Sequence, residues 1–318
     1  MSKIMDELKS KIKGKKIKVV FPELNDPRII EGVLKLIQED LVVPILIGDK
    51  NSIDTDLSGI TVINPLEYPR YKEFVQALVE RRDGKASYEE AEELLKQPNY
   101  FGTMLVYMGE AAGLVSGAAH STGDTVRPAL QIIKTKPGIS KTFGYFLMIR
   151  DDEKYIMGDC AINPNPDAKS LAEFAIESAK AAKMFGLEPK VAMLSFSTNG
   201  SAITDETKKV REATKIAQEK NSGFDIDGEM QFDAAFVQSV GKSKFKESSV
   251  AGNANTFIFP DLNSGNIGYK IAQRLGNFEA VGPILAGLNK PVNDLSRGCT
   301  PLDVYNTAII TAAQTLIE

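Results

Sequence analysis

Short apolar runs alternate along this chain with longer segments in which apolar residues recur at helical spacing. In the first part, the runs 17–23 (IKVVFPE), 42–49 (VVPILIGD) and 60–64 (ITVIN) have the length and composition of buried strands. Segment 25–40, between the first two, has the period of an amphipathic helix, with Asp26 in place to cap it. Strands and helices that alternate in this way predict an α/β fold with parallel sheets.

Capping and turn signals predict further elements. Ser87 and Glu90 have the spacing of a capping box, so a helix is expected to begin there. Two apolar runs around an acidic turn within 144–160 predict a hairpin. The Lys- and Ser-rich segment 241–252 is expected to be a solvated loop. The remaining predictions are a strand, a loop and a helix within 113–138, helices at 168–185, from about 205 and at 266–275, and strands at 191–197, 255–261 and 282–288.

Length and pattern together predict two α/β domains. A chain of 318 residues exceeds the size at which single cores usually stop growing. We expect a first domain of 1–138 plus about 292–318, and a second domain of 139–291. An apolar helix from 301 onward would return to the first domain and leave 293–300 in the crevice between the domains. Such crevices are common sites for small ligands.

Composition excludes several classes of protein. The net charge of −4 provides no overall basic field for nucleic acid or a membrane surface. No run reaches the roughly 18 consecutive apolar residues that a membrane span needs, and the lysine-rich N-terminus does not have the pattern of a signal peptide. Cys160 and Cys299 are too few for a disulfide framework. We therefore expect a cytoplasmic protein whose partners are small molecules.

Several catalytic motifs are absent or incomplete. GKS at 241–243 has Phe236 where a phosphate-binding P-loop needs glycine, and no G-x-G-x-x-G follows the first strand. His120 is the only histidine, so a multi-histidine metal site is excluded, and a Ser-His-Asp triad would have to use this residue. We expect no metal. Cys299 could be a nucleophile, but without a partner histidine a packing role is the simpler interpretation.

Three loops are rich in the small residues that allow backbone N–H groups to approach an anion. They are 116–125, 195–202 and 261–268. Arg127 lies in the helix expected after the first loop, and Lys270 follows the third. Together the loops favour a phosphorylated or nucleotide-like ligand, although turns of this kind are also common in α/β folds without one.

The stretch NDLSRGCTPLDV (293–304) brings four reactive groups close together before an apolar helix. Thr300 is a good N-cap, Pro301 suits the first helical position, and Asp303 lies three residues after the cap. Capping alone would explain Asp303, and Ser296 and Arg297 could be ordinary loop residues. The spacing leaves the structural and the functional interpretation both open.

Several longer segments resemble one enzyme family. PVNDLSRGCTPLDVYNTAIITAAQ, YFGTMLVYMG, GLVSGAAHSTGDTVRPALQIIKT and NIGYKIAQRLG are similar to segments of phosphate acetyltransferases (phosphotransacetylases), in the short form without extra N-terminal regulatory domains. The resemblance implies a fold like that of the isocitrate and isopropylmalate dehydrogenases, with the active site between two α/β domains of a homodimer. It also implies the reversible reaction of acetyl-CoA and phosphate to coenzyme A and acetyl phosphate.

The resemblance assigns roles to the residues of 293–304. Asp303 matches the general base for the coenzyme A thiol, Arg297 the residue that holds the phosphoryl group, and Ser296 the donor that stabilises the transition state. The thiolate would attack the acetyl carbonyl directly in a ternary complex, without an acyl-enzyme and without a metal. Coenzyme A is then a substrate, and no tightly bound cofactor is expected.

Other matching residues are implied to bind substrate. Arg127 matches a family arginine near the substrate, and a further family arginine corresponds to Arg82 or Arg81, of which we favour Arg82. Lys270 is a candidate contact for a phosphate of coenzyme A.

Three alternatives remain open at the level of sequence. A phosphate butyryltransferase would use the same chemistry with a larger acyl pocket. A dehydrogenase on the same kind of fold would need a nicotinamide site and acidic metal ligands, which do not assemble here. A coenzyme A or nucleotide sensor would bind ligand without turnover.

Overall fold

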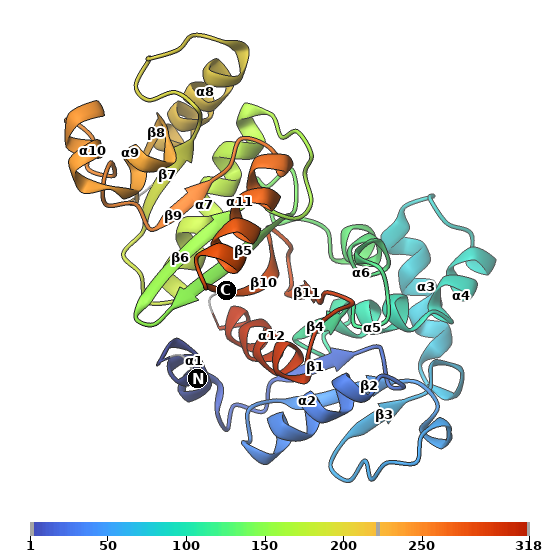
Figure 1. Ribbon diagram of the computed structural model, residues 1–318. Coiled ribbons are helices and arrows are strands. Elements are labelled where there is room, and N and C mark those ends of the chain that lie inside the picture. Colours follow the sequence, from blue (N-terminus) through green and yellow to red (C-terminus); the bar gives the residue numbers. More distant parts are fainter. Residues whose placement is uncertain (1–2, 221–222, 317–318) are drawn as a thin grey trace. The chain divides into compact units, whose positions relative to one another are not determined.

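The computed structural model describes residues 3–220 and 223–316 (Figure 1). These residues form two compact units: unit 1 comprises 3–136 and 288–316, and unit 2 comprises 137–287. Each unit has its own sheet. Within the described ranges, no helix is long and apolar enough to cross a membrane.

Unit 1 is built on five parallel strands in the order β11-β4-β1-β2-β3. Its elements are α1 (Lys3–Ile12), β1 (Lys18–Phe21), α2 (Pro27–Gln38), β2 (Val43–Ile47), a 3-10 turn (Lys50–Ser52), β3 (Thr61–Ile63), a 3-10 turn (Pro65–Glu67), α3 (Tyr71–Arg82), α4 (Tyr88–Leu95), α5 (Pro98–Tyr107), β4 (Gly113–Ser116), α6 (Thr122–Pro128), a π-helical turn (Ala129–Ile133), β11 (Val292–Asp294) and α12 (Pro301–Gln314).

The caps predicted from sequence in unit 1 are present. Asp26 accepts a hydrogen bond from the amide of Arg28 at the start of α2. Ser87 and Glu90 form both hydrogen bonds of a capping box at the start of α4. The predicted strands β1, β2 and β3 are confirmed as parallel neighbours. The mixed α/β fold class is therefore confirmed.

Helices cover both faces of the unit 1 sheet. A Cβ on Gly113 would meet Thr311 of α12 at 2.6 Å, whereas the side chain of Leu114, the next residue, contacts α5 at Gly102. Successive residues of a strand point to opposite faces. The helices α12 and α5 therefore lie on opposite sides of β4.

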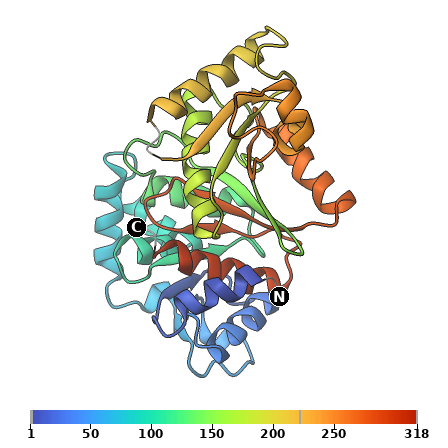
Figure 2. The same cartoon turned by 90° about the vertical axis from the view of Figure 1, so that its left-hand side faces the viewer.

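The C-terminal helix packs closely against α2, as both views show (Figures 1 and 2). The approach depends on Gly32, because a Cβ there would lie 2.9 Å from Cγ1 of Val304 and 3.0 Å from the carbonyl oxygen of Pro301. Val304 is fully buried. This contact fixes the first turn of α12 against the helix that follows β1.

Unit 2 is built on six strands in the order β10-β5-β6-β9-β7-β8. Its elements are β5 (Phe143–Arg150), β6 (Glu153–Gly158), α7 (Ala168–Met184), β7 (Lys190–Leu194), α8 (Asp205–Lys220), β8 (Asp225–Met230), α9 (Phe232–Phe236), α10 (Gln238–Lys244), β9 (Thr256–Ile258), α11 (Leu262–Leu275) and β10 (Glu279–Ala286). The predicted hairpin is confirmed as β5 and β6, which pair antiparallel. The strand expected at 282–288 is β10, and it also runs antiparallel to β5.

Aromatic side chains of β5 show how the unit 2 sheet is covered. Phe143 stacks on Phe174 of α7 with ring centroids 4.5 Å apart, and Phe146 stacks on Tyr269 of α11 at 4.0 Å. Because Phe143 and Phe146 lie an odd number of positions apart on one strand, their side chains point to opposite faces. Helices α7 and α11 therefore cover opposite faces.

The prediction of a solvated loop at 241–252 is wrong at both ends of the segment. Its first residues are the second half of α10, and Val250 and Ala251 are buried within the core of unit 2 beside Phe257. The lysines and serines that suggested a loop occupy the outer positions. A short run with two core residues gives too weak a periodic signal to reveal this packing.

We predict that Gly32→Val lowers the free energy of unfolding by about 1–3 kcal/mol, as expected for overpacking of a closed contact. Urea unfolding at neutral pH measures the change. Gly123→Ala on α6 is the matched control, because a Cβ there meets no atom closer than 3.6 Å. This control should keep or slightly raise the stability, and equal stability of the two variants would contradict the prediction.

Candidate active site

Three loops lie together at one edge of the unit 1 sheet. They follow β1, β4 and β11, at residues 22–26, 117–121 and 295–300. These strands are neighbours and run parallel, so their carboxyl ends meet at the same edge. Ligands of open α/β sheets bind outside such carboxyl ends. This edge is therefore the candidate active site.

A buried carboxylate occupies the loop after β4. Glu23, just after β1, accepts hydrogen bonds from four backbone N–H groups at 3.1, 3.0, 2.8 and 3.0 Å, those of Gly117, Ala118, Ala119 and His120 in that order. These are the amides that we expected to hold a phosphate. The expectation is wrong for these four amides, because the chain's own carboxylate already takes the place of the anion.

The side chain of His120 completes the same network. Its Nδ1 lies 2.8 Å from Oε1 of Glu23. Burial alone would raise the pKa of Glu23, but the hydrogen bonds from His120 and from the loop amides outweigh burial and lower it. The hydrogen bond to Glu23 in turn raises the pKa of His120. In the described part of the chain no serine hydroxyl bonds to this ring, so the Ser-His-Asp triad is not formed.

The loop 195–202 in unit 2 is filled in a similar way. Glu229, which is 1% exposed, accepts hydrogen bonds from the amide of Gly200 at 3.0 Å and the hydroxyl of Ser197 at 2.8 Å. Arg211 donates to the same carboxylate at 2.7 Å. The amide of Gly200 is therefore not free for phosphate either. In the third loop, Asp261 accepts the amide of Ser264 and caps α11.

The loop after β11 is fixed against the loop after β4. The amide of Leu295 donates to the carbonyl oxygen of Ser116 at 2.7 Å, which continues the strand pairing by one step. Gly117 has a φ of 116°, and a Cβ there would lie 2.5 Å from Oδ1 of Asp294 and from the carbonyl oxygen of Leu295. Only glycine allows the two backbones to approach this closely.

Asp294 is buried where these loops meet. Its Oδ2 accepts a hydrogen bond from the hydroxyl of Thr122 at 2.7 Å, whereas Oδ1 has no hydrogen-bond partner within the described ranges. Burial raises the pKa of Asp294 to about 6, with the hydrogen bond from Thr122 acting in the opposite direction. The sequence analysis did not single out Asp294, because its burial depends on strands that are distant in sequence.

The predicted cap of α12 is confirmed. Oδ2 of Asp303 accepts the amide of Thr300 at 2.7 Å and its hydroxyl at 2.8 Å, and the amide of Asp303 donates back to Thr300 at 3.3 Å. Asp303 remains exposed, and its other oxygen, Oδ1, has no partner among the described residues. The cap therefore uses one carboxylate oxygen and leaves the second available.

Ser296 and Arg297 are exposed in the same loop, just before this cap. The hydroxyl of Ser296 accepts the amide of Gly298 at 3.3 Å. In the part of the chain that the structure describes, the guanidinium of Arg297 has no hydrogen-bond or ion-pair partner. The structure thus brings the three predicted catalytic side chains onto one short exposed stretch.

Arg28, which the sequence analysis missed, connects the three loops. Its guanidinium pairs with Asp26 and donates to the carbonyl oxygens of Ala118 (2.6 Å), Arg297 (2.7 Å) and Cys299 (3.2 Å). An arginine in the first turn of α2 carries no sequence signal for contacts with residues so distant along the chain.

Arg81 and Arg82 have different environments. Arg81 donates to the carbonyl oxygens of Ile132 and Ile133 at 2.6 and 2.9 Å and lies over the ring of Tyr107, so its guanidinium is engaged within the fold. Nε of Arg82 is buried and lacks a hydrogen-bond partner in the described structure. This difference favours Arg82 over Arg81 as the residue with capacity for a ligand.

Arg82 and Arg127 both lie near Tyr100. Burial raises the pKa of Tyr100, and the positive charges of Arg127 and Arg82 oppose that rise. Arg127 is exposed on α6. The seventh predicted residue, Lys270, lies on α11 of unit 2, where it is also exposed.

Both cysteines are buried and free. Burial raises the pKa of Cys299 to about 11 and that of Cys160 well above its usual value. Such thiols are poor nucleophiles near neutral pH. The packing interpretation of Cys299 is therefore the one that the structure supports.

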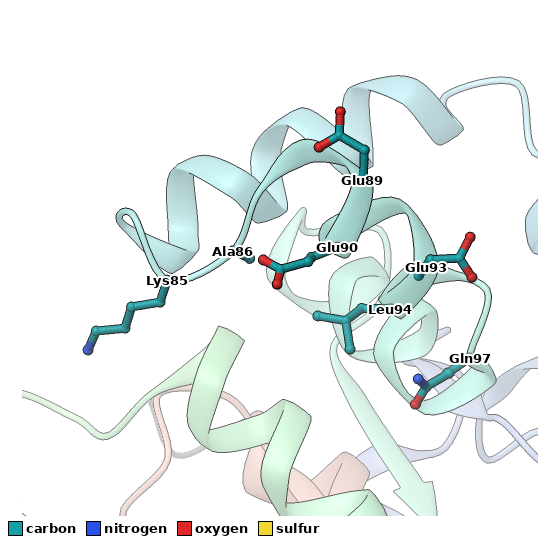
Figure 3. Close-up of a pocket in the computed structure, with 7 residues that line it drawn as sticks. All are labelled: Lys85, Ala86, Glu89, Glu90, Glu93, Leu94 and Gln97. Carbon is teal, nitrogen blue, oxygen red and sulfur yellow. The ribbon is translucent and has the colours of Figure 1, made fainter.

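The pocket beside α4 does not suit an anionic ligand (Figure 3). It has a volume of about 460 Å³ and is lined by Lys85, Ala86, Glu89, Glu90, Glu93, Leu94 and Gln97. Three of these seven residues are glutamates, so the pocket would repel a phosphate. A group of three or more His, Cys, Asp or Glu side chains able to hold a metal is not found among the described residues.

Comparison with known protein families decides the class of protein. The model of the family described as phosphate acetyl/butaryl transferase matches residues 3–312, nearly the whole chain. The chain belongs to the phosphate acetyl/butaryl transferase family. The resemblance drawn from the sequence is thereby confirmed, and the protein is an enzyme of the transferase class.

Individual members of the family are similar over their full length. A phosphate acetyltransferase of Bacillus subtilis strain 168 is 59% identical over 323 residues, which cover 99% of this chain and 100% of that protein. A solved phosphotransacetylase from Streptococcus pyogenes has a TM-score of 0.96 at 54% identity, with 100% of both chains covered. A EutD phosphotransacetylase from Staphylococcus aureus has a TM-score of 0.92 at 57% identity, with 98% of both chains covered.

The Glu23 network should make the stability of this family member depend on pH. Because the folded pKa of Glu23 lies below its usual value of 4.5, its contribution is complete above that value and is lost as pH falls through the folded pKa. Glu23→Gln should lower the free energy of unfolding at pH 7 by several kcal/mol, at roughly 1–3 kcal/mol for each buried amide left without an acceptor. The deficit should shrink as the pH falls below 4.5. Urea unfolding between pH 3 and 7 measures both effects.

The control is Glu67→Gln, because Glu67 is exposed in a 3-10 turn of the same unit. It should leave the stability at pH 7 nearly unchanged. If Glu23→Gln and Glu67→Gln had the same stability at pH 7, the Glu23 network would not stabilise the fold.

Proposed function

We propose that this chain transfers the acetyl group between acetyl phosphate and coenzyme A, so that acetyl-CoA and phosphate are interconverted with coenzyme A and acetyl phosphate. The full-length relative from Bacillus subtilis, 59% identical, is named a phosphate acetyltransferase, which supports the acetyl group as the one transferred. Phosphate and coenzyme A are both anionic, and the exposed arginines of the candidate site suit such ligands.

One observation carries the proposal. Ser296, Arg297 and Asp303 present a hydroxyl, a guanidinium and a carboxylate oxygen on one exposed stretch at the carboxyl edge of the unit 1 sheet. A hydrogen-bond donor, a cation and a base are the three groups that transfer from an acyl phosphate to a thiol requires. Their proximity on this stretch supports a catalytic role for all three.

The proposed step is a direct displacement. Asp303 takes the proton of the coenzyme A thiol through Oδ1, and the thiolate forms a bond to the acetyl carbonyl carbon. The carbon–oxygen bond to phosphate then breaks, and phosphate leaves with the electron pair. Arg297 binds the phosphoryl oxygens in a bidentate manner, and Ser296 donates to the carbonyl oxygen as negative charge develops there.

No acyl-enzyme is part of this proposal. Cys299, the thiol nearest to these residues in sequence, is 6% exposed and has a pKa raised to about 11 by burial. These properties argue against attack by Cys299 and favour a ternary complex in which both substrates are bound together. No step in the proposed chemistry is assigned to a metal, and coenzyme A takes part as a substrate.

Arg82 and Arg127 are proposed to bind coenzyme A or the acyl phosphate. The positive charges of both guanidinium groups oppose the rise in the pKa of Tyr100, and the Nε–H of Arg82 has no acceptor among the described residues. Both observations support a shared anionic ligand near this tyrosine. Lys270 is proposed to contact a phosphate of coenzyme A. A cytoplasmic location, expected from the composition, and a homodimer, implied by the resemblance, belong to the same proposal.

The first test compares acyl donors. Purified protein is mixed with coenzyme A and either acetyl phosphate or butyryl phosphate, and thioester formation is followed without nicotinamide cofactor. We expect rapid turnover with acetyl phosphate and a lower kcat/KM with butyryl phosphate. A preference for butyryl phosphate would favour the other substrate in the family name, and absence of thioester from either donor would contradict the proposal.

A second test separates the catalytic and capping roles of Asp303. Asp303→Asn should lower kcat about 10²–10⁴-fold, the usual range for loss of a general base, while the Kd for coenzyme A stays near that of the wild type. The matched control is Glu90→Gln, which removes the charge from the capping box of α4 at the same position. If both variants lost only a little stability and kept full kcat, Asp303 would act solely as a cap.

A further inference from the structure

Every N–H donor of the Arg28 guanidinium is used. Nε and Nη2 donate to the two carboxylate oxygens of Asp26 at 2.9 and 2.6 Å. Nη2 also donates to the carbonyl oxygen of Ala118 at 2.6 Å, and Nη1 donates to those of Arg297 and Cys299 at 2.7 and 3.2 Å. The five donors of an arginine thus meet five acceptors in three loops.

This arrangement is specific to arginine. The planar, forked guanidinium can donate to a carboxylate along one edge and to carbonyl oxygens along its other edges. The single nitrogen of a lysine cannot reach acceptors that lie so far apart. The side chain of Asp26 is 9% exposed and that of Arg28 is 29% exposed, so the pair is largely shielded from water. Asp26 is itself fixed, because it caps α2 through the amide of Arg28.

The carbonyl oxygens of Arg297 and Cys299, which accept from Nη1 of Arg28, belong to the loop 295–300 that carries two of the proposed catalytic residues. They flank Gly298, and the amide of Cys299 closes a turn on the carbonyl oxygen of Ser296 at 2.8 Å. Gly298 has no side chain to restrain this turn. The Arg28 contacts therefore supply the restraint that the sequence of the loop lacks.

We propose that Arg28, held by Asp26, is a positioning residue for the loop that carries Ser296 and Arg297. It acts through the backbone of Arg297 and Cys299 and touches no reacting atom. Because its donors are all occupied, Arg28 is not a ligand for the substrate phosphate. The catalytic part of this inference rests on the proposed function, whereas its structural part does not.

The test uses three variants and two readouts. Arg28→Ala removes all five hydrogen bonds, Arg28→Lys keeps the charge without the fork, and Asp26→Asn removes the ion pair but keeps a residue that caps helices well. The control is Arg70→Ala, because Arg70 also joins two segments of unit 1, through Glu73 and Glu110. All proteins are full length.

The first readout is independent of activity. Cys299 is 6% exposed and belongs to the turn that Arg28 holds, so its rate of reaction with a small thiol reagent at pH 8 reports opening of the loop. We expect the rate to rise about tenfold or more in Arg28→Ala, and less in Arg28→Lys and Asp26→Asn. Cys160 in unit 2, which is fully buried, should stay unreactive and serves as the internal control.

The second readout is steady-state kinetics of acyl transfer. Misplacement of catalytic groups by about 1 Å can cost 10²-fold, so kcat should fall by about that factor in Arg28→Ala. The KM for coenzyme A should change little, because Arg82 and Arg127 are unaltered. Arg28→Lys should not restore kcat, whereas a role of charge alone would predict that it does.

The outcomes separate this inference from the proposed function. If Cys299 in Arg28→Ala reacted at the same rate as in the wild type, the structural part of the inference would be overturned. This holds even if the wild type showed no acyl transfer at all. Faster labelling with unchanged kcat would overturn the positioning role. Faster labelling and reduced kcat in the Arg28 variants, with neither change in Arg70→Ala, would support it.

Discussion

Burial of the Glu23 carboxylate is the constraint on which the rest of the candidate active site depends. A carboxylate that is 5% exposed must have its hydration replaced by hydrogen bonds, or its burial would be too costly. Four consecutive amides and the ring of His120 do this, and in doing so they fix the loop after β4 to the end of β1. The loop after β11 is then placed by its contacts with Ser116 and Gly117. The backbones of the three loops are thus held together without any contribution from the proposed catalytic side chains.

The same use of internal carboxylates recurs in unit 2 and bears on how the enzyme would recognise anions. Asp159 accepts hydrogen bonds from the amides of Gly144, Ala161, Ile162 and Asn163, and Glu229 fills the loop after β7. Backbone amides that elsewhere cradle phosphate are here bonded to the protein's own carboxylates. These amides are therefore not available to the proposed substrates, whose recognition we assign to guanidinium groups instead. This assignment agrees with the exposed Arg297 and Arg127 and with the Nε–H of Arg82, a donor without an acceptor among the described residues.

Features that depend on residues close together in the chain could be predicted from the sequence. Contacts between residues that are distant along the chain could not. The caps at Asp26, Ser87 and Thr300 involve partners within three residues, so the residue types alone reveal them. The hydrogen bond from Arg28 to the carbonyl oxygen of Arg297 joins residues 269 positions apart, so it leaves no local sequence pattern. Small-residue loops signalled anion-binding geometry correctly but not the identity of the anion, since the partner carboxylate, Glu23, lies more than ninety positions away. The error at 241–252 has the same origin, because the burial of Val250 depends on packing rather than on its own segment.

Capping by Asp303 and its proposed role as a base are complementary rather than competing. The cap bonds Oδ2 to the amide and hydroxyl of Thr300, which removes the rotational freedom of the carboxylate and fixes the direction of Oδ1. A base that is already oriented needs no further ordering when the thiol arrives, and that saving in entropy adds to the rate. The carboxylate keeps this orientation only if the first turn of α12 is rigid. The contacts of α12 with α2 at Gly32 and of its preceding loop with Arg28 supply that rigidity.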